Sequence, residues 1–444
     1  MTTVPACAVV LAAGVGSRMK SDQPKVLHPV AGRSLLAWSL AAARAAAPDA
    51  VAVVIGPDAP AVAAEAHPAD VFVQNQRRGT GDAVAAARPA ITGRTGDVFV
   101  LFGDTPFVRP ETLDALRAAR RDGAAIAVLG FRPADPARYG RLIRGVDGAL
   151  DRIVEAADAS AEELAADLCN SGVMCLDAEK LPGWLDRLTA DNAQGEYYLT
   201  DVVALARADG LACAAVEGDP AEMLGVNDRA QLAEAEAAAQ AQLRAAAMAE
   251  GATLIAPETV FFCWDTRLGR DVVIHPHVVF GPAVTVGDRV QIKSFSHLEG
   301  AVLADDVVIG PFARLRPGAN LERRARVGNF VEIKKARLGE GAKVNHLAYV
   351  GDADIGAAAN VGAGVITCNY DGFRKHETVV GDGAFIGSNC ALVAPVTVGD
   401  GAIIGAGSVV TRDVAEHALA VARGRQTELP GWAERFRDQA NEKG

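Results

Sequence analysis

The amino-acid sequence predicts an α/β domain followed by a parallel β-helix, and three observations support this prediction. In the first half, short β-branched runs alternate with alanine-rich stretches, a pattern typical of helices packed on a parallel sheet. In the second half, an aliphatic or aromatic residue recurs at every sixth position. Between the two halves, Ala, Gln, Glu and Leu dominate a stretch without Gly or Pro. We therefore expect an α/β domain over residues 1–227, a helical linker over 228–250, and a β-helix with a C-terminal tail over 251–444.

The first half contains strand and helix patterns in alternation. Residues 8–11 and 51–55 are apolar, β-branched runs that predict strands, and residues 35–46 between them predict a helix. Residues 97–102 predict another strand, which Gly and Asp follow directly. Because ligands of parallel α/β sheets bind at the carboxyl ends of the strands, the residues after these strands are candidate site residues.

The second half keeps its six-residue period from Leu268 to Val410, apart from three slips of one residue and one insertion. Such a period is typical of a parallel β-helix in which each repeat is a short strand and a turn. The repeating positions are Leu268, Ile274, Phe280, Val286, Ile292, Leu298, Leu303, Ile309, Leu315, Leu321, Val327, Ile333, Leu338, Val344, Val350, Ile355, Val361, Thr367, Val380, Ile386, Leu392, Val398, Ile404 and Val410.

One insertion interrupts this repeat. Thr367 and Val380 are thirteen residues apart where six are expected, so residues 368–379 must leave the coil as a loop. The loop is polar, basic and aromatic. Long loops on rigid scaffolds often carry binding or catalytic residues, which makes this segment a candidate site.

Composition excludes several classes of protein. The 444 residues include 44 basic and 55 acidic side chains, so the formal net charge is 44 − 55 = −11. Without a broad basic stripe, the chain is not expected to bind nucleic acid. It contains no signal peptide and no run of about 18 apolar residues, so we expect a cytoplasmic protein without a membrane span. The seven scattered cysteines form no C-x-x-C pair and are expected to be free thiols.

A glycine-rich segment follows the first predicted strand. Residues 11–19 read LAAGVGSRM, and a Pro-Lys pair follows at residues 24–25. Glycines let backbone N–H groups approach a triphosphate, while Arg18 and Lys25 supply positive charge. The spacing is neither that of a P-loop nor that of the dinucleotide fingerprint. The pattern resembles the signature of the sugar-1-phosphate nucleotidylyltransferases.

That resemblance implies a nucleotide and sugar-phosphate site in the α/β domain. It implies that the Gln74 amide pairs with a pyrimidine of UTP, and that Asp104 and Asn227 hold Mg²⁺. Arg18 and Lys25 would stabilise charge during in-line attack on the α-phosphorus, without a protein nucleophile. The residues implied to bind nucleotide and sugar are Leu11, Ala12, Ala13, Gly14, Lys25, Gln74, Gly79, Thr80, Phe102, Gly103, Asp104, Gly140, Glu155, Asn170 and Asn227.

In the second half, His346 is the candidate general base. A single His in a repeat is more often a packing or solvated residue than a catalytic one. The nearby loop of residues 368–379 and a set of basic residues favour the catalytic interpretation. The repeat resembles the left-handed β-helix of the hexapeptide-repeat acyltransferases, and residues 309–318, 327–337 and 360–372 carry close matches to their glucosamine-1-phosphate N-acetyltransferase members.

Residues 9–423 together resemble the family of bacterial bifunctional N-acetylglucosamine-1-phosphate uridyltransferases/glucosamine-1-phosphate N-acetyltransferases. The resemblance implies acetyl transfer from acetyl-CoA to glucosamine 1-phosphate, with His346 as base, and then uridylyl transfer from UTP to N-acetylglucosamine 1-phosphate. It also implies a homotrimer and a role in peptidoglycan and lipopolysaccharide synthesis. The residues implied to bind the sugar phosphate are Arg316, Lys334, Tyr349, Asn360 and Lys375, and those implied to bind acetyl-CoA are Ala363, Asn369, Tyr370, Ser388, Ala406 and Arg423.

Two other hypotheses compete with this one. The β-helix could serve only as an oligomerisation scaffold for a single-activity nucleotidylyltransferase, but a scaffold does not need His346 and the phosphate-binding cations together. A regulatory module that binds nucleotide sugars without chemistry is the other alternative. The set of Arg18, Lys25, Asp104 and Asn227 argues against it.

Overall fold

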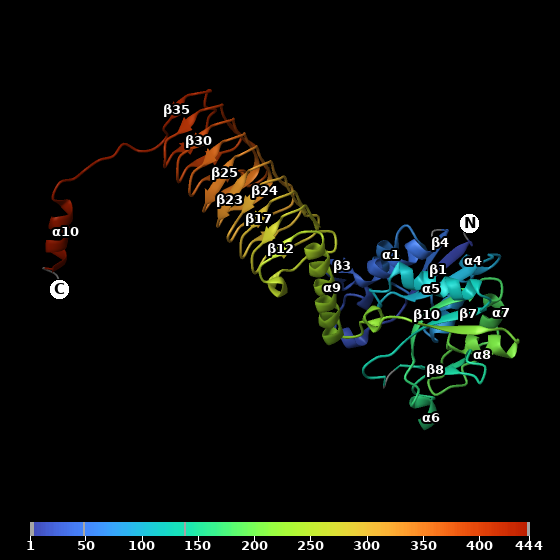
Figure 1. Ribbon diagram of the computed structural model, residues 1–444. Helices are drawn as coiled ribbons and strands as arrows, with labels where there is room; N and C mark the ends of the chain where they lie inside the picture. Colours follow the sequence, from blue (N-terminus) through green and yellow to red (C-terminus); the bar gives the residue numbers. More distant parts are fainter. Residues whose placement is uncertain (1–3, 48, 137–138, 442–444) are drawn as a thin grey trace. The chain divides into compact units, whose positions relative to one another are not determined.

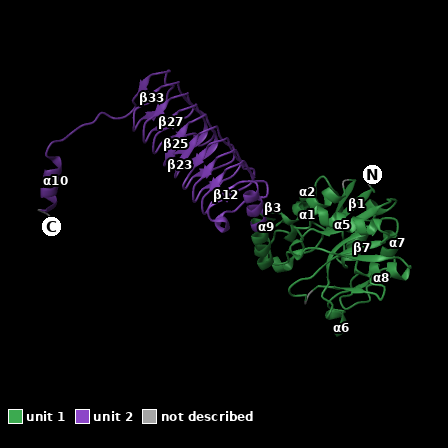
Figure 2. Ribbon diagram, viewed as in Figure 1, with its two compact units in different colours: residues 1–240 green, residues 241–444 purple. Residues whose placement is uncertain are grey.

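The computed structural model describes residues 4–47, 49–136 and 139–441, which form two compact units. Residues 1–240 make up unit 1 and residues 241–444 make up unit 2 (Figure 2). Within the described ranges, no helix is both long and apolar enough to cross a membrane. All seven cysteines are free, and all but Cys368 are buried.

Unit 1 is built around a nine-stranded sheet (Figure 1). Its strands, together with a separate two-stranded ribbon of β2 and β3, are β1 (Ala6–Ala12), β2 (Pro29–Val30), β3 (Arg33–Ser34), β4 (Ala50–Ile55), β5 (Asp70–Val73), β6 (Asp97–Phe102), β7 (Ile126–Phe131), β8 (Arg141–Arg144), β9 (Leu150–Val154), β10 (Cys169–Asp177) and β11 (Cys213–Glu217). Its helices are α1 (Leu35–Ala46), α2 (Pro60–Ala66), α3 (Thr80–Ala86), α4 (Arg88–Ile91), α5 (Pro110–Arg121), α6 (Ala161–Leu164), α7 (Leu181–Leu185) and α8 (Asp201–Ala208).

Helices cover both faces of this sheet, whose main path runs β11-β7-β10-β6-β1-β4-β5. Buried residues of α1, α2 and α5 belong to one hydrophobic cluster, and buried residues of α3, α4, α7 and α8 belong to another. All seven residues of the central strand β1 are buried, as expected for a strand covered on both faces. Helix α1 begins after Ser34, whose hydroxyl accepts a hydrogen bond from Ala37 N at 3.0 Å. The elements predicted over residues 8–11, 35–46, 51–55 and 97–102 are β1, α1, β4 and β6.

The sheet is mixed, whereas the sequence predicted a parallel one. Strand β10 lies between β6 and β7 and is antiparallel to both. A parallel connection needs a crossover over one face of the sheet. The chain instead enters β10 through the β8–β9 hairpin and the single turn of α6, which allows it to return in the opposite direction.

Helix α9 (Arg229–Ala249) joins the two units, and the boundary between units 1 and 2 falls within it. Its sequence is rich in strong helix formers, which accounts for its length of 21 residues. Gly251 follows with φ of +103°, a conformation that costs glycine little, and its N–H donates to Met248 O at 3.1 Å.

Unit 2 is a parallel β-helix of short strands (Figure 1). One column consists of β12 (Thr253–Leu254), β14 (Val273–Ile274), β17 (Gln291–Ile292), β20 (Val308–Ile309), β23 (Arg326–Asn329), β25 (Lys343–His346), β27 (Asn360–Val361), β30 (Phe385–Ile386), β33 (Ile403–Ile404) and β35 (Leu419–Ala420). The other strands are β13 (Arg267–Leu268), β15 (Val279–Phe280), β16 (Thr285–Val286), β18 (His297–Leu298), β19 (Ala301–Leu303), β21 (Arg314–Leu315), β22 (Ala319–Leu321), β24 (Glu332–Leu338), β26 (Tyr349–Ile355), β28 (Ile366–Cys368), β29 (Thr378–Val380), β31 (Ala391–Val393), β32 (Val396–Val398) and β34 (Val409–Val410).

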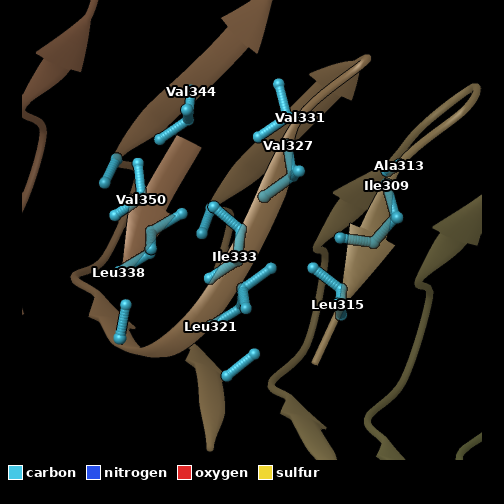
Figure 3. Packing of buried hydrophobic residues seen from close by; sticks show 14 of the residues in the cluster. Ile309, Ala313, Leu315, Leu321, Val327, Val331, Ile333, Leu338, Val344 and Val350 are labelled. Carbon is cyan, nitrogen blue, oxygen red and sulfur yellow. The ribbon is translucent and has the colours of Figure 1, made fainter. Parts of the chain in front are cut away.

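The six-residue repeat forms the core of the β-helix, as predicted. Every repeating position is buried except Leu268, which is partly buried and packs against the same core. Ile309, Val327 and Val344 are register partners in successive coils, so each apolar side chain stacks on its equivalents (Figure 3). The repeat therefore supplies nearest-neighbour contacts along the whole unit.

Stacked aromatic side chains mark one corner of the first coils, and we call them the corner ladder. It consists of His277, Phe295, Phe312 and Phe330, whose adjacent ring centroids are 4.9, 4.9 and 5.1 Å apart. All four residues have positive φ, and the three phenylalanines are exposed. The turn in the next coil carries Leu347, which is also exposed and has positive φ.

The predicted loop leaves the coil between β28 and β29, which end at Cys368 and begin at Thr378. Beyond β35 the chain leaves the β-helix, and α10 (Trp432–Asn441) near its end has no buried residue.

Candidate functional sites

Unit 1 has a pocket of about 270 Å³ at the carboxyl ends of β1 and β6. Ten of the residues predicted to bind nucleotide line it, although they come from four separate segments. They are Leu11, Ala12, Ala13, Gly14, Lys25, Gln74, Gly79, Thr80, Phe102 and Asp104. The pocket lies where a parallel arrangement of β1 and β6 places strand-end residues together.

A charged cluster lies at this pocket. Lys25 Nζ donates a short hydrogen bond to Asp104 Oδ2 and a second one of 3.0 Å to Asn227 Oδ1. The Lys25 side chain is only 10% exposed and that of Asp104 is 21% exposed, so water screens this ion pair little. Two oxygen atoms from distant parts of the chain thus converge on one cationic nitrogen.

Backbone contacts bring the three members of this cluster together. Gly103 N donates to Leu11 O at 2.9 Å, and Val226 N donates to Asp104 O at 3.0 Å, which places Asn227 beside the end of β6. The glycine-rich turn packs closely on the lysine. A Cβ at Gly16, where φ is +66°, would lie 2.5 Å from Lys25 Cβ.

Gln74 is buried at the end of β5, and its amide group has a defined orientation. Its Nε2 donates to Gly79 O at 3.0 Å and to Asp82 Oδ2 at 2.9 Å. Both amide hydrogens therefore have partners, and Oε1 remains as an acceptor. Gly79 has φ of +110°, and a Cβ there would lie 2.5 Å from Tyr197 O. This close approach explains why the segment needs glycine.

A second group in unit 1 consists of the predicted sugar-binding residues Gly140, Glu155 and Asn170. Asn170 N donates to Gly140 O at 2.8 Å, and a Cβ at Gly140 would lie 3.2 Å from Glu155 Oε2. Thr200 Oγ1 donates to Glu155 Oε1 at 3.2 Å. Burial raises the pKa of the Glu155 carboxyl, because desolvation opposes ionisation more than this hydrogen bond favours it.

The lining of this pocket differs from the predicted set of residues. Arg18 is exposed in the short 3-10 helix Ser17–Met19 and does not line the pocket. Glu196 lines it, and so does Arg77, which the sequence did not single out. Arg77 Nε donates to Ala13 O at 2.6 Å. Arg77 could have been predicted from its position between Gln74 and Gly79, because this segment was already assigned to the site.

In unit 2, His346 is exposed at the end of β25. Its Nδ1 lies 2.7 Å from Asn329 Oδ1, on the neighbouring strand β23. The two residues are register partners in adjacent coils. The prediction of His346 did not include Asn329, which a search one coil earlier in the sequence would have found.

Several predicted sugar-phosphate residues lie on, or directly after, the strands that precede and follow His346. Arg316 Nη1 donates to Glu332 Oε1 at 2.8 Å, which raises the pKa of the guanidinium. Glu332 is the register partner of Tyr349, and Lys334 is the register partner of Gly351. Arg316, Lys334 and Tyr349 therefore gather on adjacent coils, together with the carboxylate of Glu332, which the sequence analysis did not single out.

The remaining predicted sugar-phosphate residues lie elsewhere in unit 2. Asn360 begins β27 and is the register partner of Lys343. Lys375 lies in the loop, with its Nζ 4.4 Å from the centroid of the Tyr370 ring. This cation–π contact joins a residue assigned to the sugar site with one assigned to acetyl-CoA.

Hydrogen bonds within the loop hold it in shape. Asp371 Oδ1 accepts from Phe373 N at 2.7 Å and from Arg374 N at 2.6 Å, and His376 Nε2 lies 2.7 Å from Asp371 Oδ2. Backbone donors and this imidazole lower the pKa of the Asp371 carboxyl. Phe373 nevertheless projects with its side chain 93% exposed.

The predicted acetyl-CoA residues outside the loop form a column along one corner of the β-helix. Gly364 N donates to His346 O at 3.1 Å, Asn389 N donates to Ala363 O at 2.7 Å, and Gly407 N donates to Ser388 O at 2.8 Å. The column ends where Arg423 Nη1 donates to Ala406 O at 2.6 Å. In the earlier coils, aromatic rings fill this corner. Beyond His346 the column carries the small side chains of Ala363, Ser388 and Ala406 instead, and we call this part the open corner.

Asn369, in the loop of residues 368–379, contacts a residue of the predicted sugar-phosphate site. It is buried, and its Nδ2 donates a short hydrogen bond to Asp352 Oδ2 and lies 3.4 Å from Tyr349 Oη. Asn369 thus links the loop to Tyr349, one of the predicted sugar-phosphate residues.

Two family models match parts of the chain. The MobA-like NTP transferase domain matches residues 8–171, which include every residue that lines the pocket of unit 1 except Glu196, and the segment with Gly140 and Asn170. The bacterial transferase hexapeptide family, with six repeats, matches residues 377–412 in the last coils of the β-helix.

Relatives match nearly the whole chain. The bifunctional protein GlmU of Azorhizobium caulinodans is 60% identical over 433 residues, which cover 97% of this chain and 96% of the relative. The protein of the same name from Paramagnetospirillum magneticum is 56% identical over 433 residues, with the same coverage. That from Sphingopyxis alaskensis is 53% identical over 442 residues, which cover 99% of this chain and 98% of the relative.

Proposed function

The chain belongs to the family of the bifunctional protein GlmU, and we propose on this basis that it synthesises UDP-N-acetylglucosamine by two transfer reactions. Unit 2 would transfer the acetyl group of acetyl-CoA to glucosamine 1-phosphate. Unit 1 would then transfer a uridylyl group from UTP to N-acetylglucosamine 1-phosphate and release pyrophosphate. The single observation that carries the proposal is the relatedness over nearly the whole chain, at 53–60% identity.

Uridylyl transfer in unit 1 needs positioning and charge stabilisation rather than a protein nucleophile. A phosphate oxygen of the sugar phosphate would attack the α-phosphorus of UTP, and the bond between that phosphorus and the bridging oxygen to the β-phosphate would break. Negative charge accumulates on the transferred phosphoryl group and on pyrophosphate. Lys25, which lines the pocket, would stabilise this charge, and Arg18 would approach from the exposed turn beside it.

Asp104 and Asn227 fit a Mg²⁺ site. A carboxylate and an amide oxygen are ligands of the kind that Mg²⁺ prefers. The fit is supported by the hydrogen bonds that both oxygens accept from Lys25 Nζ, since they already converge on one cation. When bound, Mg²⁺ would neutralise charge on the triphosphate. Chelation with EDTA should therefore abolish pyrophosphate release and leave CoA release unchanged.

Gln74 accounts for the choice of uracil. Because both Nε2 hydrogens are donated to Gly79 and Asp82, the amide offers the acceptor Oε1. Uracil presents an N3–H donor, whereas N3 of cytosine is an acceptor. The orientation of Gln74 would thus favour UTP over CTP. Gly140, Glu155 and Asn170 would hydrogen-bond the sugar hydroxyls and the N-acetyl group.

Acetyl transfer in unit 2 is nucleophilic attack by an amine on a thioester. The amine nitrogen of glucosamine 1-phosphate would attack the acetyl carbonyl carbon, a C–N bond would form, and the C–S bond would break to release CoA. His346 would accept the proton that the amine loses. This role is supported by the exposed position of the imidazole, at the boundary between the corner ladder and the open corner.

Arg316 and Lys334 would bind the phosphate of glucosamine 1-phosphate. Their gathering on adjacent coils supports this role, and the Glu332 carboxylate would keep the Arg316 fork oriented before the substrate arrives. Tyr349, Asn360 and Lys375 would contact the sugar. The phosphate must compete with Glu332 for Arg316 or share it.

The open corner beyond His346 suits the extended acetyl-CoA molecule. Ala363, Ser388 and Ala406 leave room along it, and Arg423 offers a cation at its far end. Asn369 and Tyr370 would contact the acetyl-CoA from the side of the loop. We further propose that the chain acts as a cytoplasmic homotrimer, in which the exposed corner ladder and the projecting loop would meet neighbouring subunits.

The partial reactions test this proposal directly. With acetyl-CoA present and UTP omitted, CoA release should depend on added glucosamine 1-phosphate. With UTP and N-acetylglucosamine 1-phosphate and no acetyl-CoA, pyrophosphate release should proceed unaided. Absence of the first reaction, with the second intact, would reduce the β-helix to an oligomerisation scaffold.

A further inference from the structure

We propose that Asn329 is a positioning residue for acetyl transfer, which holds the His346 imidazole in the tautomer that leaves Nε2 free to accept a proton. This inference rests on the proposed role of His346 as the base. It adds a residue that does not contact substrate but acts through the histidine.

The contact between the two side chains determines where the imidazole proton lies. His346 Nδ1 is 2.7 Å from Asn329 Oδ1, a carbonyl oxygen that can only accept a hydrogen bond. In the neutral ring, the nitrogen facing this oxygen must therefore carry the hydrogen. The other nitrogen, Nε2, then has an unshared electron pair, which a general base requires.

The backbone holds both residues in place. Asn329 and His346 are register partners on β23 and β25, one coil apart. Leu347 N donates to Asn329 O at 3.0 Å, and Gly364 N donates to His346 O at 3.1 Å, so hydrogen bonds secure the turn on both sides. Beneath them, Val327 and Val344 are buried in the core of the β-helix. The Asn329–His346 contact therefore joins two side chains on a rigid frame.

A purely structural role explains this contact poorly. His346 is exposed, so its Nδ1 could bond water at little cost in stability. The corner ladder and the buried apolar stack already hold these coils together. What the contact adds is a fixed ring orientation and a fixed tautomer. Without the contact to Asn329, the ring can turn and present an N–H group to the substrate amine, and a nitrogen that already carries a hydrogen cannot accept a proton.

The experiment compares variants that remove the acceptor with one that retains it. Asn329→Ala and the nearly isosteric Asn329→Leu should lower kcat of glucosamine-1-phosphate-dependent CoA release by about 10- to 100-fold, a part of the ~10²- to 10⁴-fold contribution of a general base. KM for both substrates should change by less than about threefold, because Asn329 does not touch them. Asn329→Asp keeps an acceptor oxygen at the same place and should recover most of the lost kcat.

The control is Asn320→Ala, the same change at an exposed strand position of β22, which should leave kcat unchanged. Uridylyl transfer and melting temperature, measured on every variant, report folding. Wild-type kcat in folded Asn329→Ala and Asn329→Leu would overturn the inference, as would an Asn329→Asp variant no faster than these two. If His346→Ala were as active as wild type, the role of His346 as the base would fail, whereas the proposed function of unit 2 would fail only if wild type showed no glucosamine-1-phosphate-dependent CoA release; the two failures are therefore distinguishable.

Discussion

Replacing Asp82 with Ala should weaken the preference of the uridylyl site for UTP over CTP. Asp82 does not need to touch the base for this effect. Its Oδ2 accepts one of the two Nε2 hydrogens of Gln74, and Gly79 O accepts the other. In the wild-type chain, turning the Gln74 amide over would break both hydrogen bonds and place Oε1 against a carboxylate and a carbonyl oxygen.

The magnitude follows from the loss of one of these bonds. A hydrogen bond to a charged group contributes about 1.5–3 kcal/mol, and the Asp82 side chain is only 15% exposed. Without the Asp82 carboxylate, the Gln74 amide can turn over and lose only its neutral hydrogen bond to Gly79. In this turned orientation its NH₂ group can donate to N3 of cytosine. Because about 1.4 kcal/mol corresponds to tenfold, the ratio of kcat/KM for UTP to that for CTP should fall roughly 10- to 100-fold.

The assay is pyrophosphate release with N-acetylglucosamine 1-phosphate and either nucleotide. Using the ratio cancels any general loss of activity, such as the effect of removing an acidic residue from the first turn of α3. Asp186→Ala, which breaks an exposed pair with Arg88, is the matched control and should leave the ratio unchanged. A ratio in Asp82→Ala that stays within about twofold of wild type would refute the proposed orientation of Gln74.

Three further predictions concern packing and burial. Gly172→Ala should destabilise unit 1 by about 1–3 kcal/mol in urea denaturation and should slow uridylyl transfer. The cause is that φ of Gly172 is +83° and that the new Cβ would lie 2.5 Å from the Phe102 ring at the pocket. Gly183→Ala is the control and should not destabilise unit 1, because there is open space around Gly183. Ile333→Ala should destabilise the β-helix by about 2–5 kcal/mol and Ile333→Val by about 0.5–1.5 kcal/mol, because Ile333 is fully buried between Leu315 and Val350. Equal destabilisation by the two substitutions would contradict this packing. The folded-state pKa of Glu155 is raised above its ordinary value of 4.5, so the folded state retains a proton that the unfolded state loses, and stability falls as pH rises through this range. The stability of Glu155→Gln relative to wild type should therefore increase as the pH rises above 4.5, and a difference independent of pH would contradict the role of burial.

Periodicity allowed the β-helix to be predicted because each coil repeats the same local requirement. Residues such as Ile309 and Ile333 must be apolar wherever the coil turns inward, and this leaves a visible period in the sequence. The same regularity made the insertion before Val380 visible as a loop. Strand-end residues such as Asp104 were predictable for a related reason, since parallel neighbours bring their carboxyl ends to one edge.

Features that depend on pairing between distant segments were not predicted. The antiparallel course of β10 follows from the β8–β9 hairpin, whose pairing has no strong local signal. Arg77 lines the pocket of unit 1 through tertiary contacts that no motif recorded. Glu332 and Asn329 lie 16 and 17 residues from the partners Arg316 and His346, which is about one coil. Because three hexapeptides make one coil, the partner of a known candidate residue could be sought about one coil earlier or later in the sequence.

We propose that this chain contains two active sites that work independently. The most direct measurement is both partial reactions in His346→Ala and in Asp104→Ala. The first variant should lose about 10²- to 10⁴-fold in CoA release and keep uridylyl transfer. The second should lose pyrophosphate release and keep CoA release. Loss of both reactions from either substitution in a folded protein, or intact CoA release in His346→Ala, would show that the two sites are not independent or that His346 is not the base.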